Sequence, residues 1–214
     1  YAGVWSSGGN TNTARESEGS SSACSIPATI AFGGVPPASA TAINESYNGS
    51  SWTEVNDMNT AKRGPSGLGT STAALSAGGD VGAAPFLNVV ETWDGSSWTE
   101  TTEINTARSY AFAFGIQTAG VIAGGYIPPS YGTTGVTEYW NGSSWTETGD
   151  LNTARFGIAG AGVYTAGLIS GNPSGNTETF NGSSWTEVAD LNTGRGENVN
   201  TGSQTAALTF GGSP

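Results

Sequence analysis

Hydrophobic residues along this chain fall into short runs that end in glycine, without helical spacing. The run TAALSAGG (72–79) is apolar up to a glycine pair, and the segments NVVETW (88–93) and SSWTET (96–101) combine β-branched and aromatic residues. Such residues are enriched in strands, and no stretch places apolar residues at helical spacing between helix caps. The pattern predicts an all-β chain with almost no helix.

The pattern recurs five times. The heptapeptide NGSSWTE stands at 48–54, 141–147 and 181–187, and DGSSWTE stands at 94–100. The tryptophans that align the copies lie 47, 46, 47 and 40 residues apart: Trp5, Trp52, Trp98, Trp145 and Trp185. Periods of this length are typical of propellers and solenoids. We therefore divide residues 1–214, as a single domain, into a closing strand (about 1–11) and five units: 12–58, 59–104, 105–151, 152–191 and 192–214.

The Asn-Gly or Asp-Gly pair in each heptapeptide predicts a two-residue hairpin turn, because a type I′ turn needs positive φ at both central positions. In the second unit this register places Trp93 opposite Ser96 and Glu91 opposite Trp98, with all four side chains on one face. A face with two large aromatic residues is too apolar to leave in water in every unit, so we expect the units to stack through it. The equivalent residues are Glu45, Tyr47 and Trp52, then Glu138, Trp140 and Trp145, then Glu178, Phe180 and Trp185.

Along the chain a glycine pair, or Gly-Asn in the fourth unit, is followed by an aromatic residue and Trp, then by an apolar residue six positions after the Trp and a basic residue four beyond that. This combination resembles the kelch motif. The resemblance covers the whole chain and implies an all-β fold in which each unit is one four-stranded blade of a β-propeller of about five blades. Asn stands where kelch repeats usually have Pro before Thr-Ala-Arg. The near-identical units are also similar to kelch-like repeats of marine bacteriophages and environmental bacteria.

The glycine pair is interpreted as a requirement of backbone geometry, because Asn172 replaces the second glycine in the fourth unit and Asn is the residue that best tolerates positive φ. Strands would run outward from the channel in chain order, as 61–69, 72–79, 87–93 and 96–102 in the second unit. The last blade then lacks most of its third strand, and an open sheet edge is a template for pairing. We expect residues 1–214 to belong to a longer chain or to associate with another chain through this blade.

Charge and composition argue against several classes of function. Six Lys and Arg against 17 Asp and Glu leave a net charge of −11, which disfavours nucleic acid or an anionic membrane as partner. No apolar run approaches the ~18 residues of a membrane span, so no membrane insertion is expected. The chain has no histidine and a single cysteine, Cys24, which we interpret as an inert thiol. We expect no metal site, no cofactor and no enzymatic activity.

Acidic residues recur in three sets, with one member per complete unit. The first set is Glu45, Glu91, Glu138 and Glu178; the second is Glu54, Glu100, Glu147 and Glu187; the third is Asp57, Glu103, Asp150 and Asp190. Paired carboxylates can hydrolyse glycosides, and repeated carboxylates could bind cations around a ring. A catalytic pair is normally unique in a chain, so the repetition favours structural or surface roles.

Basic residues share one position at the start of the innermost strand: Arg15, Lys62, Arg108, Arg155 and Arg195. One interpretation is a ring of positive charge that captures an anion at the channel mouth. We favour a structural role, in which each side chain bonds to backbone carbonyls and to acids of the adjoining blade.

The loops between second and third strands differ most among units: 35–42, 80–86, 126–135 and 173–176. Variable loops on a rigid scaffold make good recognition surfaces, and they are also where insertions are tolerated. Phe86, Tyr126 and Tyr131 are the residues best suited to stack on a sugar or a protein.

The resemblance implies a binding or structural module located on a virion or outside the cell. It would form part of a phage tail fibre, spike or surface decoration, with a host glycan or protein and other chains of the same assembly as partners. The alternative is a secreted or cell-surface bacterial protein that is lectin-like or forms filaments.

Overall fold

The computed structural model describes residues 8–21, 28–37, 39–82, 85–157, 159–171 and 175–213. These residues form twenty β-strands, and no helix occurs among them. The described part of the chain therefore contains no helix that could cross a membrane. The fold is all-β, as the hydrophobic pattern predicts. Trp5, Cys24 and Asn172, which the sequence analysis singled out, lie outside the described residues.

Four sheets of four antiparallel strands and a final two-stranded hairpin make up the fold, and each falls within one sequence unit. The first sheet contains β1 (Gly19–Ser20), β2 (Thr29–Phe32), β3 (Asn44–Tyr47) and β4 (Trp52–Val55). The second contains β5 (Ser66–Thr70), β6 (Ala73–Ala77), β7 (Val90–Trp93) and β8 (Trp98–Thr101). The third contains β9 (Phe112–Ile116), β10 (Ala119–Ala123), β13 (Thr137–Trp140) and β14 (Trp145–Glu147).

The fourth sheet contains β15 (Ala159–Val163), β16 (Ala166–Ser170), β17 (Thr177–Phe180) and β18 (Trp185–Val188). The last hairpin pairs β19 (Gly196–Ser203) with β20 (Ala206–Ser213). A small extra hairpin, β11 (Tyr126–Ile127) with β12 (Gly132–Thr133), is formed by the loop between β10 and β13. The sequence analysis treated that loop only as a variable segment.

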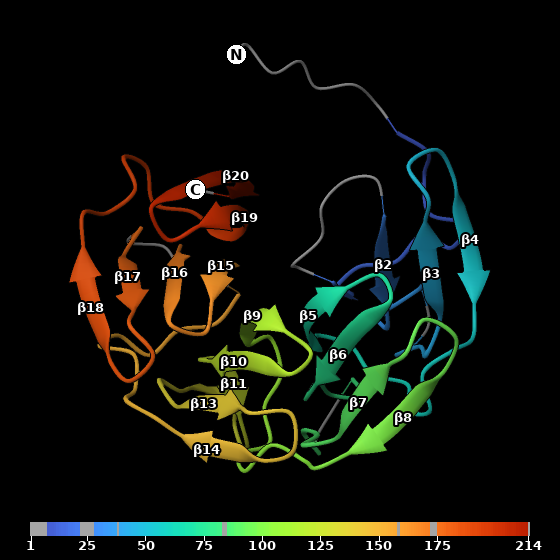
Figure 1. The fold of residues 1–214 in the computed structure, drawn as a ribbon, viewed down its shortest axis with the longest axis horizontal. Helices are drawn as coiled ribbons and strands as arrows, with labels where there is room; N and C mark the ends of the chain where they lie inside the picture. Colours follow the sequence, from blue (N-terminus) through green and yellow to red (C-terminus); the bar gives the residue numbers. More distant parts are fainter. Residues whose placement is uncertain are drawn as a thin grey trace.

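The sheets are arranged around a common centre, and their strands follow one another outward in chain order (Figure 1). A cavity of about 500 Å³ is lined by residues of β1, β5, β9, β15 and β19, so the innermost strands of all four sheets and of the last hairpin face the same space. This arrangement is consistent with a β-propeller-like fold.

The hairpin turns differ from the predicted type I′ geometry. Trp93 pairs with Trp98 and Glu91 pairs with Glu100, so the pairing is shifted by two residues from the predicted register. The physical reason is the side chain of Asp94, whose Oδ1 accepts the N–H groups of Ser96 and Ser97 at 2.8 Å each and thereby stabilises a wider loop. Positive φ is needed only at Gly95. Because a shift of two residues keeps each side chain on its face, the predicted aromatic and acidic face survives.

Neighbouring sheets pack through the face that carries the repeated tryptophans. Trp93 and Trp98 of the second sheet pack with Ile30 and Phe32 of the first, and the Phe32 and Trp98 ring centroids lie 4.9 Å apart. The same arrangement brings Trp140 and Trp145 against the second sheet, and Phe180 and Trp185 against the third. Trp98, Trp145 and Trp185 are each buried, whereas Trp52 of the first sheet is half-buried.

The glycine pair allows adjacent sheets to approach closely. Gly78 and Gly79 both have positive φ, and the N–H of Gly79 donates to the carbonyl of Arg108 in the next unit at 2.8 Å. A Cβ atom on Gly78 would lie 2.4 Å from the same carbonyl oxygen, which no side chain permits. The glycine pair is therefore required by the backbone, as its replacement by Asn in one unit suggested.

Candidate functional site

The repeated acid, basic residue and asparagine of each complete unit form one buried network. In the third unit, Arg108 donates to Oε1 of Glu138 at 2.6 Å, and Asn105 donates to Oε2 through its backbone and side-chain nitrogens at 2.8 Å each. The Asn105 side chain also donates to the carbonyl of Trp145 at 3.4 Å. Pro at this position could not donate either of the bonds to Glu138, because it has no backbone N–H and no side-chain amide.

Each of these ion pairs joins two residues of the same unit, which corrects the expected pairing with acids of the adjoining blade. The pairs are Arg15 with Glu45, Lys62 with Glu91, Arg108 with Glu138, and Arg155 with Glu178. Both side chains of every pair are almost fully buried. A ring of positive charge open to an anion is therefore wrong for these four units. Arg195, in the last hairpin, donates instead to the carbonyl of Gly211 at 2.9 Å.

Burial and pairing act in opposite directions on these groups. Burial lowers the pKa of Arg108, and the carboxylate of Glu138 opposes that effect. Burial would raise the pKa of Glu45, but hydrogen bonds from Asn12, Arg15 and Thr13 outweigh it and lower the pKa. The paired acids and basic residues therefore have a structural role. Removing one partner would leave the other as an uncompensated buried charge.

Most acids of the third set have a role at the start of a strand. Asp57, Asp150 and Asp190 each accept the backbone N–H of the first residue of the third strand of their sheet, at 3.2 to 3.3 Å. Within the described part of the chain, no three His, Cys, Asp or Glu residues gather as a metal site would require.

We call the space enclosed by the innermost strands the channel. One end of the channel is built from residues whose backbone lies in the left-handed region. The residue two positions after each repeated basic residue has φ between 52° and 58°: Ser17, Gly64, Tyr110, Gly157 and Glu197. Backbone hydrogen bonds link these residues from sheet to sheet, from Gly64 to Ser17, Tyr110 to Gly64, Gly157 to Tyr110 and Glu197 to Gly157, at 2.8 to 3.1 Å. The described residues thus form a chain of four links around the channel mouth.

Three of these five residues are not glycine, although the left-handed backbone favours glycine. The described residues with positive φ that are not glycine are Ser17, Tyr110, Tyr131 and Glu197, and all four lie at this end of the channel. Left-handed backbone in such residues costs about 1 kcal/mol or more, and it clusters at functional sites. The observed strain therefore marks this end as the candidate site.

The predicted loop aromatics meet here in a continuous series of ring contacts. Phe86 and Tyr131 have centroids 4.9 Å apart, and Tyr131 and Tyr126 lie 5.6 Å apart. Tyr126 stacks on Phe156 at 3.9 Å and meets Tyr110 edge-on at 6.1 Å. We call these five residues the aromatic face. Phe86 is buried, so it supports the face, whereas Tyr131 is 40% exposed.

Arg63 fixes the exposed part of the aromatic face. Its Nε donates to Oδ1 of the buried Asp80 at 2.5 Å, and one of its terminal nitrogens lies 3.5 Å from the hydroxyl of Tyr131. The bond to Asp80 raises the pKa of Arg63, which therefore stays charged. Tyr131 is held by a side chain from a different sheet.

A cavity of about 700 Å³ adjoins the aromatic face, and we call it the mouth cavity. Tyr110, Tyr126 and Phe156 line it, together with the acids Glu16, Glu18 and Glu197. Among the described residues, no lysine or arginine lines it. The mouth cavity therefore combines aromatic rings with negative charge.

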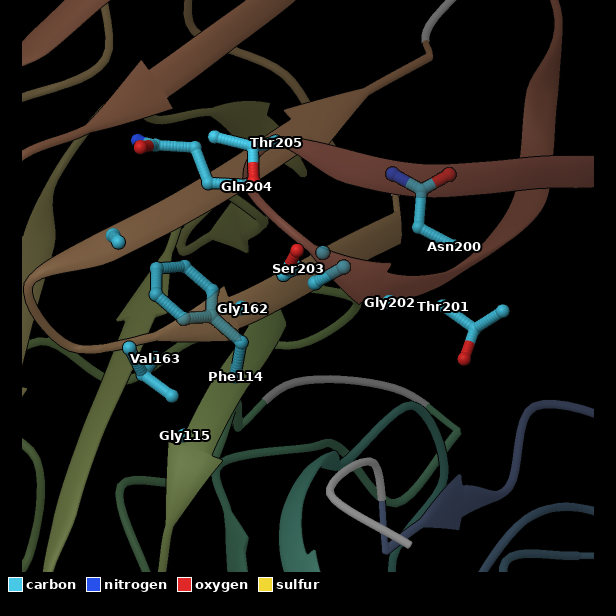
Figure 2. A pocket seen from close by; sticks show the side chains of 13 residues that line it. Phe114, Gly115, Gly162, Val163, Asn200, Thr201, Gly202, Ser203, Gln204 and Thr205 are labelled. Carbon is cyan, nitrogen blue, oxygen red and sulfur yellow. The ribbon is translucent and has the colours of Figure 1, made fainter. Parts of the chain in front are cut away.

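The opposite end of the channel is chemically plainer. A cavity of about 500 Å³ lies there between the hairpin tips of β15–β16 and β19–β20, with Phe114 and Val163 on one side and Asn200, Ser203 and Gln204 on the other (Figure 2). The Gln204 side chain donates to the carbonyls of Gly167 and Phe180, so it already serves to join the last hairpin to the fourth sheet. None of the described residues that line this second cavity is charged.

Sequence reasoning proposed Phe86, Tyr126 and Tyr131 but missed Tyr110 and Phe156. Tyr110 had a visible signal, because it stands where the second and fourth units have glycine. Phe156 had none, since its approach to Tyr126 depends on how neighbouring sheets are placed. Comparison with known protein families and with curated proteins finds no match to this chain.

Proposed function

We propose that the chain is a non-enzymatic binding and structural module, built as a kelch-like propeller of about five blades, and that its aromatic face binds a glycan or protein of a host. The observation that supports this most is the convergence of Phe86, Tyr126 and Tyr131, from two different loops, with Tyr110 and Phe156, which precede inner strands. Rigid aromatic side chains give large contact areas at low entropic cost.

The proposed setting is a virion, in a tail fibre, spike or surface decoration. This part of the proposal rests on the likeness of the repeats to kelch-like repeats of bacteriophages. Detection of the chain in purified virions by mass spectrometry and immunogold labelling would support it. Detection only in the secreted or surface fraction of a bacterium would favour the alternative, a lectin-like or filament-forming protein.

Binding is tested by substitution on the aromatic face. Tyr131→Ala should weaken binding to host cells or to an array of surface glycans at least tenfold, with little change in melting temperature, because Tyr131 is exposed. Tyr164→Ala is the matched control. Tyr164 lies in the turn between β15 and β16, at the other end of the channel, and its ring stacks on that of Tyr139 with the centroids 3.7 Å apart. Equal binding by wild type and Tyr131→Ala would contradict the proposed site.

A further inference from the structure

The carboxylates of the mouth cavity are uncompensated. Glu16, Glu18 and Glu197 are exposed, and none of them forms an ion pair in the described part of the chain. The basic residues are committed elsewhere, four of them to the buried pairs, Arg63 to Asp80 and Arg195 to a carbonyl. The negative charge of this cavity therefore has no basic partner in the part of the chain that the structure describes.

Aromatic rings form another part of the same lining. Tyr126 stacks on Phe156 and meets Tyr110 edge-on, and burial, then Tyr110 and Glu197, raise the pKa of Tyr126. Glu197 and Tyr126 line the same cavity. Ring faces and carboxylates attract the same kind of group, a positive charge on an apolar body.

The strained backbone places these groups. Ser17, Tyr110 and Glu197 carry side chains at the repeat position where other units have glycine, and all three line the mouth cavity. The hydroxyls of Tyr110 and Ser17 lie 3.2 Å apart, which links two of the three. Glycine at these positions would remove the strain and would also remove three of the side chains that line the cavity.

Building on the binding role proposed above, we propose that the mouth cavity binds an organic cation, an ammonium group that carries methyl or ring carbons. Its volume of about 700 Å³ suits a small ligand or the end group of a larger one. Two classes of ligand carry such a cation, those with a quaternary ammonium head group and those with the protonated amine of an amino sugar.

Calorimetric titration with choline tests the proposal. The matched neutral probe is 3,3-dimethyl-1-butanol, which has the same shape with carbon in place of the charged nitrogen. We expect saturable binding of choline and at least tenfold weaker binding of the alcohol. Titration with glucosamine and with glucose distinguishes the two classes of ligand, because only an amino-sugar site would prefer glucosamine to choline.

Variants assign the binding to this cavity. Glu197→Gly should weaken choline binding at least threefold while the melting temperature stays the same or rises, which a purely structural role for Glu197 would not produce. Glu54→Gln, which neutralises an exposed acid on the outer strand β4, is the matched control and should bind as wild type. Tyr126→Ala, which removes a ring from the cavity, should abolish choline binding.

The outcomes separate this inference from the proposed function. Equal binding of choline and the neutral alcohol, or no binding of choline or glucosamine by a protein that binds a neutral host glycan, would overturn the cation inference and leave the proposed function standing. Loss of choline binding in Glu54→Gln equal to that in Glu197→Gly would overturn the assignment to the mouth cavity. A protein that binds neither cations nor any host glycan or protein would contradict both proposals.

Discussion

Lys62 stands where the other complete units have arginine. Its Nζ lies 3.3 Å from Oε1 of Glu91 and donates to no backbone carbonyl among the described residues. Arg108, at the equivalent position, also donates to the carbonyls of Val136 and Gly124. Lysine cannot reproduce this planar set of donors. The buried network of the second unit is therefore incomplete.

Lys62→Arg should raise the free energy of unfolding by about 1 kcal/mol, the usual contribution of one added hydrogen bond. Urea denaturation followed by tryptophan fluorescence measures it. Arg108→Lys is the reciprocal variant and should lower stability by a similar amount. If Lys62→Arg were less stable than wild type, the cavity around Lys62 would be too small for the guanidinium.

Asp94 makes one hairpin turn sensitive to acid. Hydrogen bonds from Ser97 and Ser96 lower the pKa of Asp94 to about 2. A group whose pKa is lowered by folding stabilises the fold when it is ionised. Its contribution is present above its unfolded pKa of about 4 and is lost as the pH falls toward 2.

The equivalent turns carry Asn48, Asn141 and Asn181, whose amide oxygens accept the same bonds without titrating. Asp94→Asn should therefore remove part of the loss of stability between pH 4 and pH 2, measured by thermal melting at each pH. An unchanged pH profile in Asp94→Asn would show that the acid sensitivity arises at other carboxylates.

At the scale of the strands and sheets, the contact between sheets depends on the repeated tryptophans. Trp98 is only 6% exposed and packs against the first sheet, so Trp98→Ala should lower the free energy of unfolding by roughly 3–5 kcal/mol. Trp52→Ala is the control and should cost less, because Trp52 is half-buried. Equal denaturation midpoints for Trp98→Ala and wild type would mean that Trp98 contributes nothing to stacking.

Strand order was expected from the likeness of each repeat unit to a four-stranded blade, and the strands of the four described sheets follow that order. The side chains on each face were also predictable, since their alternation is fixed once the strands are known. The register was not, because the two-residue turn rule takes no account of the Asp94 side chain as an acceptor. Loop aromatics could be proposed from composition, but the contact of Tyr126 with Phe156 joins two units and depends on the placement of whole sheets.

At the scale of the whole molecule, the last hairpin differs from the four sheets. Among the described residues, no strand pairs with the outer edge of β20. Arg195 also has no carboxylate partner among them. In every complete unit the equivalent basic residue pairs with a glutamate on the third strand. Val199 and Leu208 are also about half exposed, at 52% and 53%. A strand with the pattern Glu-x-aromatic would satisfy all three features.

A synthetic peptide of residues 88–102 carries such a strand and its turn. We expect it to raise the melting temperature of the protein, with a smaller effect for the peptide in which Glu91 is replaced by Gln. Sedimentation of the protein alone would show self-association through the same edge. A monomer of 21.5 kDa that unfolds cooperatively and ignores the peptide would mean that the chain already covers this edge.

The chain of backbone hydrogen bonds around the channel mouth has a consequence for how this protein can diversify. Its donors and acceptors are main-chain atoms, so the links from Gly64 to Ser17 and from Glu197 to Gly157 make no demand on side-chain identity. Serine, glycine, tyrosine and glutamate already occupy the linked positions. Duplicated units could therefore exchange residues here one at a time, at a cost of about 1 kcal/mol each. The architecture would remain constant while the side chains that line the channel mouth change.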